Sequence, residues 1–168
     1  RTNLDTDIFF SYKVIHPELQ QNAQMLERFT YEAETAARLE HPHIMPVYDS
    51  GTDLQGRPFY TMKLLQGKTL AQLIEALDND PTLTSLNELL EILIKICNAI
   101  CYAHQQGIIH RDLKPDNIMI GDFGEVLVLD WGLARVPDNN SPIDFGDVPA
   151  HLTQSGSIIG TPAYMSPE

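Results

Sequence analysis

The chain has 168 residues, of which 43% are hydrophobic and 20% charged, and its net charge is −12. These values are ordinary for a single globular domain. They argue against a nucleic-acid-binding protein, because contacts to the phosphate backbone need clustered Lys and Arg. No apolar run approaches the roughly 20 residues of a membrane span, so we expect no membrane contact from this segment.

The two cysteines, Cys97 and Cys101, are four positions apart within an apolar run. That spacing places both on one face of a helix, which we expect to lie in the core. Two cysteines are too few for a disulfide framework or a structural zinc site. The sequence starts without a signal-peptide pattern, and together these features predict a reduced, cytoplasmic setting.

The first predicted element is a strand over residues 7–15, which is rich in β-branched and aromatic side chains. Lys13 lies within it between apolar neighbours. A helix is expected over residues 22–39, where apolar side chains recur at helical spacing. Two glutamates of this helix, Glu32 and Glu34, are candidates to pair with Lys13. They lie about 200° apart around the helix, so both cannot face the same lysine.

The middle of the chain predicts further strands and helices. Strands are expected over residues 47–51 and 57–62, on either side of a polar turn. A short amphipathic helix follows over residues 69–77. A long apolar helix over residues 86–104 begins with a capping box, and its wide apolar arc predicts that it is buried.

The loop after this helix, residues 110–117, reads His-Arg-Asp-Leu-Lys-Pro-Asp-Asn. It places a carboxylate, an ammonium and a carboxamide in one tight segment. This set suits the transfer of a phosphoryl group. Asp112 can accept a hydroxyl proton, Lys114 can neutralise phosphate charge, and Asn117 can bind a magnesium ion.

A strand, a glycine-bounded turn and a second strand are expected next, ending at Asp130. The tripeptide Asp-Phe-Gly occurs twice nearby, starting at Asp122 and at Asp144. Asp122 follows Asn117 too closely for both side chains to reach one ion, since the chain must first run out and return. Asp144 follows no strand and lies in a segment of loop composition. We therefore expect Asp130 to be the second metal ligand.

These motifs, in this order, resemble those of eukaryotic-type serine/threonine protein kinases, and the ending Gly-Thr-Pro-Ala-Tyr-Met-Ser-Pro-Glu is similar to the bacterial members. The resemblance implies a truncated α+β, two-lobe kinase fold, with an N-lobe antiparallel sheet plus helix and a partial helical C-lobe. Residues 1–62 would be an N-lobe without its glycine-rich loop, residues 63–67 the hinge, and residues 68–168 the C-lobe through the activation segment. The chain is then a catalytic-domain fragment, which we expect to be inactive alone.

The resemblance also implies ATP and Mg²⁺ as cofactors, and serine or threonine hydroxyls of proteins as substrates. Lys13 would orient the α- and β-phosphates and pair with Glu32, which leaves the other glutamate on the solvated face. Met62 would lie at the back of the adenine site, and backbone groups of Lys63 and Leu65 would bind the adenine. The catalytic-loop residues and Asp130 keep the roles given above.

The same resemblance implies a regulatory site and shows one departure at the metal-binding tripeptide. Trp131 stands where the family commonly has Phe, and Ala36, one turn after the paired glutamate, would leave room for the larger ring. Arg111 occupies a place where the family binds an activation-loop phosphate, and Thr153 and Ser155 are the expected phosphorylation sites. Thr161 is expected to contact the catalytic Asp and Lys and to stay unmodified.

Two other readings of the sequence stay open at this point. One is a pseudokinase, a binding or scaffolding module that keeps the fold without the chemistry. The other is a small-molecule kinase, which would share the catalytic Asp but not the closing Thr-Pro-Ala-Tyr-Met-Ser-Pro-Glu. No Gly-x-Gly-x-x-Gly occurs in this sequence. Whether a longer protein contains the glycine-rich loop would distinguish an active kinase from a pseudokinase.

Overall fold

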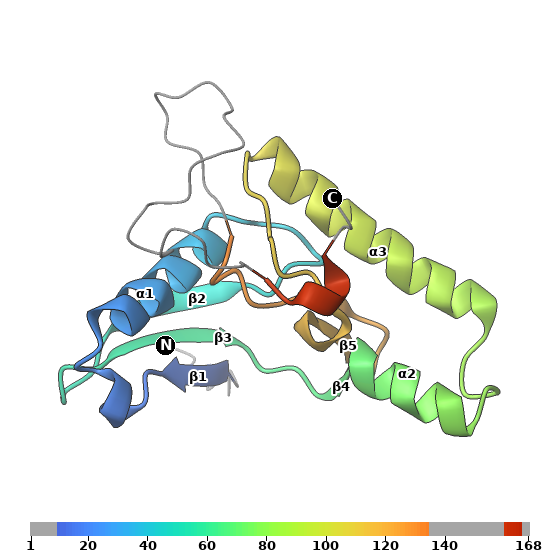
Figure 1. Ribbon diagram of the computed structural model, residues 1–168, viewed down its shortest axis with the longest axis horizontal. Helices are drawn as coiled ribbons and strands as arrows, with labels where there is room; N and C mark the ends of the chain where they lie inside the picture. The colour runs from blue at the N-terminus through green and yellow to red at the C-terminus, as the bar shows by residue number, and fades with distance from the viewer. Residues whose placement is uncertain (1–9, 135–159, 166–168) are drawn as a thin grey trace, which may run out of the picture.

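The structure is a computed structural model that describes residues 10–134 and 160–165. It contains two three-stranded sheets, both with antiparallel pairing. The first sheet carries one helix, α1 (Ala23–Ala37), and the second lies beside α2 (Leu70–Asn79) and α3 (Leu86–Gln105) (Figure 1). This arrangement confirms the predicted α+β fold of a sheet with one helix followed by a helical part.

The first sheet consists of β1 (Phe10–Val14), β2 (Val47–Thr52) and β3 (Pro58–Lys63), in the order β1-β3-β2. The register between β1 and β3 sets Lys13 opposite Tyr60. Residues directly opposite each other on paired strands have their side chains on the same face of the sheet, so Lys13 and Tyr60 share one face. The next side chain along each strand points to the other face. On the other face the rings of Tyr12 and Phe59 stack with their centroids 4.9 Å apart. The alternation thus directs the polar side chain of Lys13 toward the interior of the molecule.

A short 3₁₀ turn (Pro17–Leu19) connects β1 to α1, whose start is fixed by Asn22. The Asn22 side chain accepts hydrogen bonds from the backbone N–H groups of Gln24 and Met25 in the first turn of the helix. Glu34 is exposed, as expected. The side chain of Glu32 is only 14% exposed and lies on the face turned toward the sheet.

The second sheet consists of β4 (Gly67–Thr69), β5 (Ile118–Gly121) and β6 (Val126–Val128), in that order. A 3₁₀ turn (Pro115–Asn117) leads into β5. Gly67 has a φ of 151°, and a side chain there would collide with the backbone carbonyl of Ile120, so this close approach of β4 to β5 requires glycine. The turn between β5 and β6 holds Asp122 and Phe123, and the Phe123 side chain is 94% exposed. Asp122 therefore lies at the tip of the hairpin, as the sequence predicts.

Both helices of the second part begin with a capping box. In α2, Thr69 and Gln72 bond to each other's backbone N–H groups. In α3, Ser85 and Glu88 do the same, which confirms the predicted start of that helix. Among the helices that the structure describes, none is both long and apolar enough to cross a membrane.

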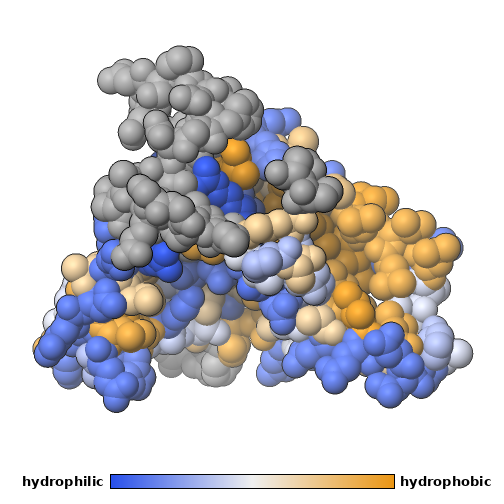
Figure 2. Space-filling model, viewed as in Figure 1, coloured by the Kyte–Doolittle hydropathy of each residue, from blue (hydrophilic) through white to orange (hydrophobic). Residues whose placement is uncertain are grey.

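The prediction that α3 is buried around a wide arc is wrong. Only Ile96, Ala99 and Ala103 are buried along it. The remaining apolar side chains are mostly exposed, among them Leu86, Leu90, Leu93 and Ile94. Figure 2 shows a hydrophobic area over α3. Cys97 and Cys101 lie on this exposed side as free thiols, so the expectation that they lie in the core is also wrong. Helical periodicity predicts which side chains share a face, whereas burial depends on what packs against that face.

A core cluster connects α1 with α3, β5 and β6. Beside it, the segment between α1 and β2 pairs with β6. The Met45 N–H donates to the Val128 carbonyl at 3.1 Å, and the Val128 N–H donates to the His43 carbonyl at 2.9 Å. Ala36 and Trp131 both belong to the buried cluster, with 8% and 1% exposure. The cluster thus contains the predicted combination of a small helix residue and a large ring.

Replacing Ala36 with Leu is expected to lower the free energy of unfolding by about 1–3 kcal/mol, because the larger side chain would clash with the Trp131 ring if the two share a layer of the buried cluster. Thermal unfolding measures this loss, and activity should fall with it. Ala37→Leu is the matched control, since Ala37 is the next residue of α1 and is exposed. If both variants were as stable as the wild type, Ala36 and Trp131 would not share a packed layer.

Candidate functional site

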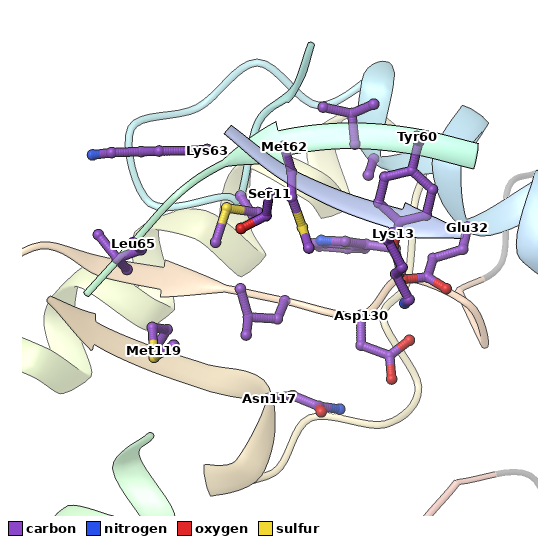
Figure 3. Close-up of a pocket in the computed structure, with 15 residues that line it drawn as sticks. Ser11, Lys13, Glu32, Tyr60, Met62, Lys63, Leu65, Asn117, Met119 and Asp130 are labelled. Atoms are coloured by element: carbon purple, nitrogen blue, oxygen red, sulfur yellow. The ribbon is translucent and has the colours of Figure 1, made fainter. Parts of the chain in front are cut away.

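A cavity of about 280 Å³ lies between the two sheets (Figure 3). Its walls come from β1, α1 and β3 on one side and from β5 and the end of the hairpin on the other. Every residue proposed from the sequence to bind nucleotide or metal lines it: Lys13, Glu32, Met62, Lys63, Leu65, Asn117 and Asp130. Sequence reasoning had not included several apolar lining residues, namely Met45, Val47, Met119 and Leu129.

The polar end of the cavity contains the expected pair of Lys13 and Glu32. The Lys13 Nζ lies 2.7 Å from Glu32 Oε1. The Lys13 side chain is 42% exposed, whereas that of Glu32 is 14% exposed. In Figure 3 both groups lie above Asn117 and Asp130, at the same end of the cavity. An ammonium held in this position can bind an anionic ligand in the cavity.

Leu65 and Met119 lie at the opposite end of the cavity, and Met62 lies between them and the charged pair (Figure 3). The Lys63 side chain points away from these residues in Figure 3. Its Nζ lies 3.2 Å from Glu125 Oε1 on the β5–β6 hairpin. Hydrogen bonds from backbone groups and from Lys63 lower the pKa of Glu125, so this carboxylate stays ionised near neutral pH. The pair connects the end of β3 to the β5–β6 hairpin.

Asn117 and Asp130 are brought together by the hairpin, as the strand-turn-strand pattern predicted. Asn117 begins the hairpin, and Asp130 lies two residues after the end of β6. The Leu129 N–H donates to the Asn117 carbonyl at 2.8 Å, which ties the two ends to each other. The Asn117 Nδ2 donates to the Asp112 carbonyl at 2.8 Å, so its Oδ1 is the atom with acceptor capacity for a cation. Asp122 lies at the far tip of the hairpin and does not line the cavity.

The carboxylate of Asp112 is held by donors on both oxygens. The Thr161 hydroxyl donates to Oδ1 at 2.6 Å, and the Lys114 Nζ lies 2.9 Å from Oδ2. The Lys114 Nζ also donates to the Thr161 hydroxyl at 3.0 Å, which closes the triangle expected from the sequence. Burial alone would raise the pKa of Asp112, but these bonds hold it below its usual range, and the bond to Asp112 raises the pKa of Lys114. Both groups are therefore charged at neutral pH.

His110 fixes this loop against the end of the hairpin. Its ring is 3% exposed, Nε2 lies 2.9 Å from the Leu129 carbonyl, and Nδ1 lies 3.2 Å from the Asp112 N–H. The carbonyl can only accept and the N–H can only donate, so the ring is neutral with its proton on Nε2. Burial lowers the pKa of His110, which favours the same neutral form. Packing against Trp131, 4.7 Å between ring centroids, completes its surroundings.

Two residues next to the polar groups have strained backbones. Arg111 has a φ of 67° and Asp130 a φ of 58°, in the left-handed region that few residues other than glycine adopt. Such conformations cost on the order of 1–3 kcal/mol and are often found at functional sites. Arg111 also lines a surface hollow with Asp112 and Thr161. Thr153, Ser155 and Asp144 lie outside the described residues.

Comparison with known proteins places the chain in a family. The family model described as protein kinase domain matches residues 2–168. A serine/threonine-protein kinase PknD of Protochlamydia amoebophila is 40% identical, and the match covers 93% of this chain and 17% of the relative. The protein of the same name from Chlamydia abortus is also 40% identical, with 93% and 18% covered. The chain thus spans less than a fifth of the length of these relatives.

Solved structures give the same result at the level of the fold. A crystal structure of the PknI kinase domain of Mycobacterium tuberculosis matches with a TM-score of 0.59 and 33% identity, over 76% of this chain and 51% of that chain. A second crystal structure of that domain matches with a TM-score of 0.58 and 33% identity, over 73% of this chain and 47% of that chain. The chain is a member of the protein kinase domain family.

Proposed function

We propose that this chain is part of the catalytic domain of a longer protein that phosphorylates serine and threonine hydroxyls of other proteins with ATP. The observation that carries the proposal is the Asp112–Lys114–Thr161 cluster, held beside a cavity with the Lys13–Glu32 pair. Residues 1–62 and 68–168 would form parts of two lobes, joined by a hinge over residues 63–67. Protein kinases generally use ATP and Mg²⁺, and the residues of this cavity fit both.

The cavity has an apolar end and a charged end, which suits a nucleotide. The adenine would lie among Met62, Leu65 and Met119, with backbone groups of Lys63 and Leu65 as its hydrogen-bond partners. Lys13 would orient the α- and β-phosphates at the other end. The Lys63–Glu125 ion pair supports this assignment, because it holds the Lys63 side chain at the hairpin and away from the apolar end of the cavity.

The donor set at the charged end suits magnesium, which prefers oxygen ligands and is often held by one or two carboxylates together with substrate phosphates. The Asn117 Oδ1 and the Asp130 carboxylate would hold the ion. When bound, it neutralises charge that develops on the phosphates. The hydrogen bonds of Asn117 to Asp112 and of Leu129 to Asn117 keep both ligands in place before any nucleotide arrives.

The catalytic loop would act mainly by positioning and electrostatics. Asp112 is an ionised carboxylate with acceptor capacity beyond its partners Thr161, Lys114 and Asn117, so it can orient a substrate hydroxyl and take its proton. Lys114 would stabilise charge on the transferred phosphoryl group. Thr161 orients both side chains through its hydroxyl, which donates to one and accepts from the other.

The proposal also includes regulation by phosphorylation, the cellular compartment and the kind of partner. Arg111 would bind a phosphate on Thr153 or Ser155, because a phosphate adds roughly −1.5 to −2 charges and three acceptor oxygens. The support is the place of Arg111 beside Asp112 at the surface hollow. The free thiols of Cys97 and Cys101 are compatible with a reducing, cytoplasmic compartment. The net charge of −12 speaks against nucleic acid as a partner.

The test is transfer of labelled γ-phosphate from ATP to a basic protein substrate by the full-length protein, followed by phosphoamino-acid analysis. We expect label on serine and threonine only, and only with Mg²⁺. Nucleotide binding without transfer would instead show a pseudokinase. Label on an aminoglycoside and not on protein would show a small-molecule kinase.

A further inference from the structure

Tyr60 of β3 shares its hydrogen-bond acceptor with Lys13. The Tyr60 hydroxyl donates to Glu32 Oε1 at 2.6 Å, and the same oxygen accepts from the Lys13 Nζ at 2.7 Å. The register between β1 and β3 makes this possible, because it sets Lys13 and Tyr60 directly opposite each other. The Lys13 Nζ lies 5.3 Å from the centre of the Tyr60 ring, so the two donors approach Glu32 from one side of the sheet (Figure 3).

The Tyr60 ring also packs against α1 itself. Phe29 lies three positions before Glu32 on the helix, and its ring centroid is 5.2 Å from that of Tyr60. Residues three positions apart lie on the same face of a helix. Tyr60 therefore binds α1 through one apolar and one polar contact, both on the face that carries the carboxylate.

The two donors differ in their access to water while α1 lies against the sheet. The Lys13 side chain is 42% exposed, so water can replace Glu32 as its partner. Tyr60 is 4% exposed with α1 in place, so its hydroxyl depends on Glu32 as an acceptor rather than on water. A buried hydroxyl without an acceptor is costly, and a hydrogen bond to a charged group is stronger than one between neutral groups. Burial, together with the charge of Glu32, raises the pKa of Tyr60 far above its usual range, so the hydroxyl remains a donor at any physiological pH.

We infer that Tyr60 is a positioning residue that keeps α1 against the sheet, so that the Lys13–Glu32 pair is formed before nucleotide binds. The inference rests on the proposed function in one respect, namely that Lys13 orients the phosphates of ATP. It adds to that function a third member of the pair, on a different strand. Tyr60 touches neither phosphate nor substrate in this role and acts through Glu32.

The test replaces Tyr60 with Phe in the full-length protein, which removes the hydroxyl and keeps the ring. The apparent Kd and the KM for ATP should rise about three- to tenfold, because a smaller share of the free protein has α1 in the binding position. At saturating ATP, kcat should change less than about twofold, because bound nucleotide restores that position. Tyr48→Phe is the matched control, since Tyr48 is an exposed tyrosine of β2, and it should match the wild type.

A Glu32→Ala background separates positioning through Glu32 from a general structural role. Adding Tyr60→Phe to Glu32→Ala should leave the Kd for ATP unchanged, since the acceptor is already gone. An equal loss of affinity in both backgrounds would overturn the inference, as would an unchanged Kd in the single variant. A wild-type protein that fails to bind or use ATP would instead overturn the proposed function.

Hydrogen exchange of the α1 amides tests the same inference without nucleotide and without relying on the Tyr60→Phe variant alone. In Lys13→Met, α1 should stay protected, because Tyr60 still donates to Glu32. Protection should drop in Tyr60→Phe and further in the double variant that combines Lys13→Met with Tyr60→Phe. Loss of protection in Lys13→Met as large as in the double variant would show that Lys13 alone holds the helix.

Discussion

Replacing Asp112 with Asn should reduce phosphoryl transfer by the full-length protein on the order of 100- to 10,000-fold, as expected for loss of a general base. The amide keeps the size of the carboxylate but has no negative charge and only one oxygen, so it cannot take the substrate proton. Asp112 does not line the cavity, so the Kd for ATP should stay within about twofold of the wild type. Single-turnover transfer and equilibrium binding measure the two effects separately.

Asp116→Asn is the matched control for this variant. Asp116 belongs to the same short loop, and its side chain is exposed. The same change of charge there should leave transfer close to the wild-type rate. If Asp112→Asn were as active as the control, the catalytic loop would have been assigned wrongly, whatever the outcome for nucleotide binding.

Replacing Asp130 with Ala should abolish activity, because it removes the carboxylate that would hold magnesium at the charged end of the cavity. The loss should appear in transfer and also in the affinity for ATP measured with Mg²⁺, whereas affinity measured without Mg²⁺ should change little. The backbone at Asp130 is in the left-handed region, so Asp130→Asn, which tolerates that region better than Ala, distinguishes loss of charge from loss of fold. Asp130→Asn should be nearly as inactive.

Asp122→Ala is the control for Asp130→Ala, because both residues follow a strand of the same hairpin and both precede an aromatic residue and a glycine. Asp122 is exposed at the hairpin tip, so the loss of activity in this variant should be small. The reverse order of effects would mean that the Asp-Phe-Gly tripeptide, and not the Asp-Trp-Gly tripeptide, belongs to the site.

The catalytic loop and the hairpin could be predicted from the sequence because their geometry is local. Asp112, Lys114 and Asn117 lie in one short segment, and the out-and-back path of the hairpin brings Asp130 close to Asn117. The Lys13–Glu32 pair followed from helical periodicity together with the family resemblance, since periodicity alone left Glu34 open. The structure then placed Glu34 on the exposed face.

Contacts between residues that are far apart in the sequence could not be predicted from it. Tyr60 read as one apolar residue of a strand, because only the register with β1 sets it opposite Lys13. The Lys63–Glu125 pair spans 62 positions, and nothing local to either residue indicates it. The burial of α3 and of its two cysteines was predicted wrongly for one reason. A helical pattern shows which side chains share a face but does not show what packs against that face. One pattern could have indicated Tyr60. Alternate residues of a strand share a face, so Tyr60 lies on the same face as Met62, which was expected at the adenine site.

The most direct test of the site is a crystal structure of the full-length protein with a non-hydrolysable ATP analogue and Mn²⁺, whose anomalous signal locates the metal independently of the protein density. We expect the metal peak at the Asn117 Oδ1 and the Asp130 carboxylate, with the phosphates at Lys13 and the adenine beside Met62 and Leu65. A metal peak at Asp122, or a nucleotide bound outside the cavity between the two sheets, would contradict this account.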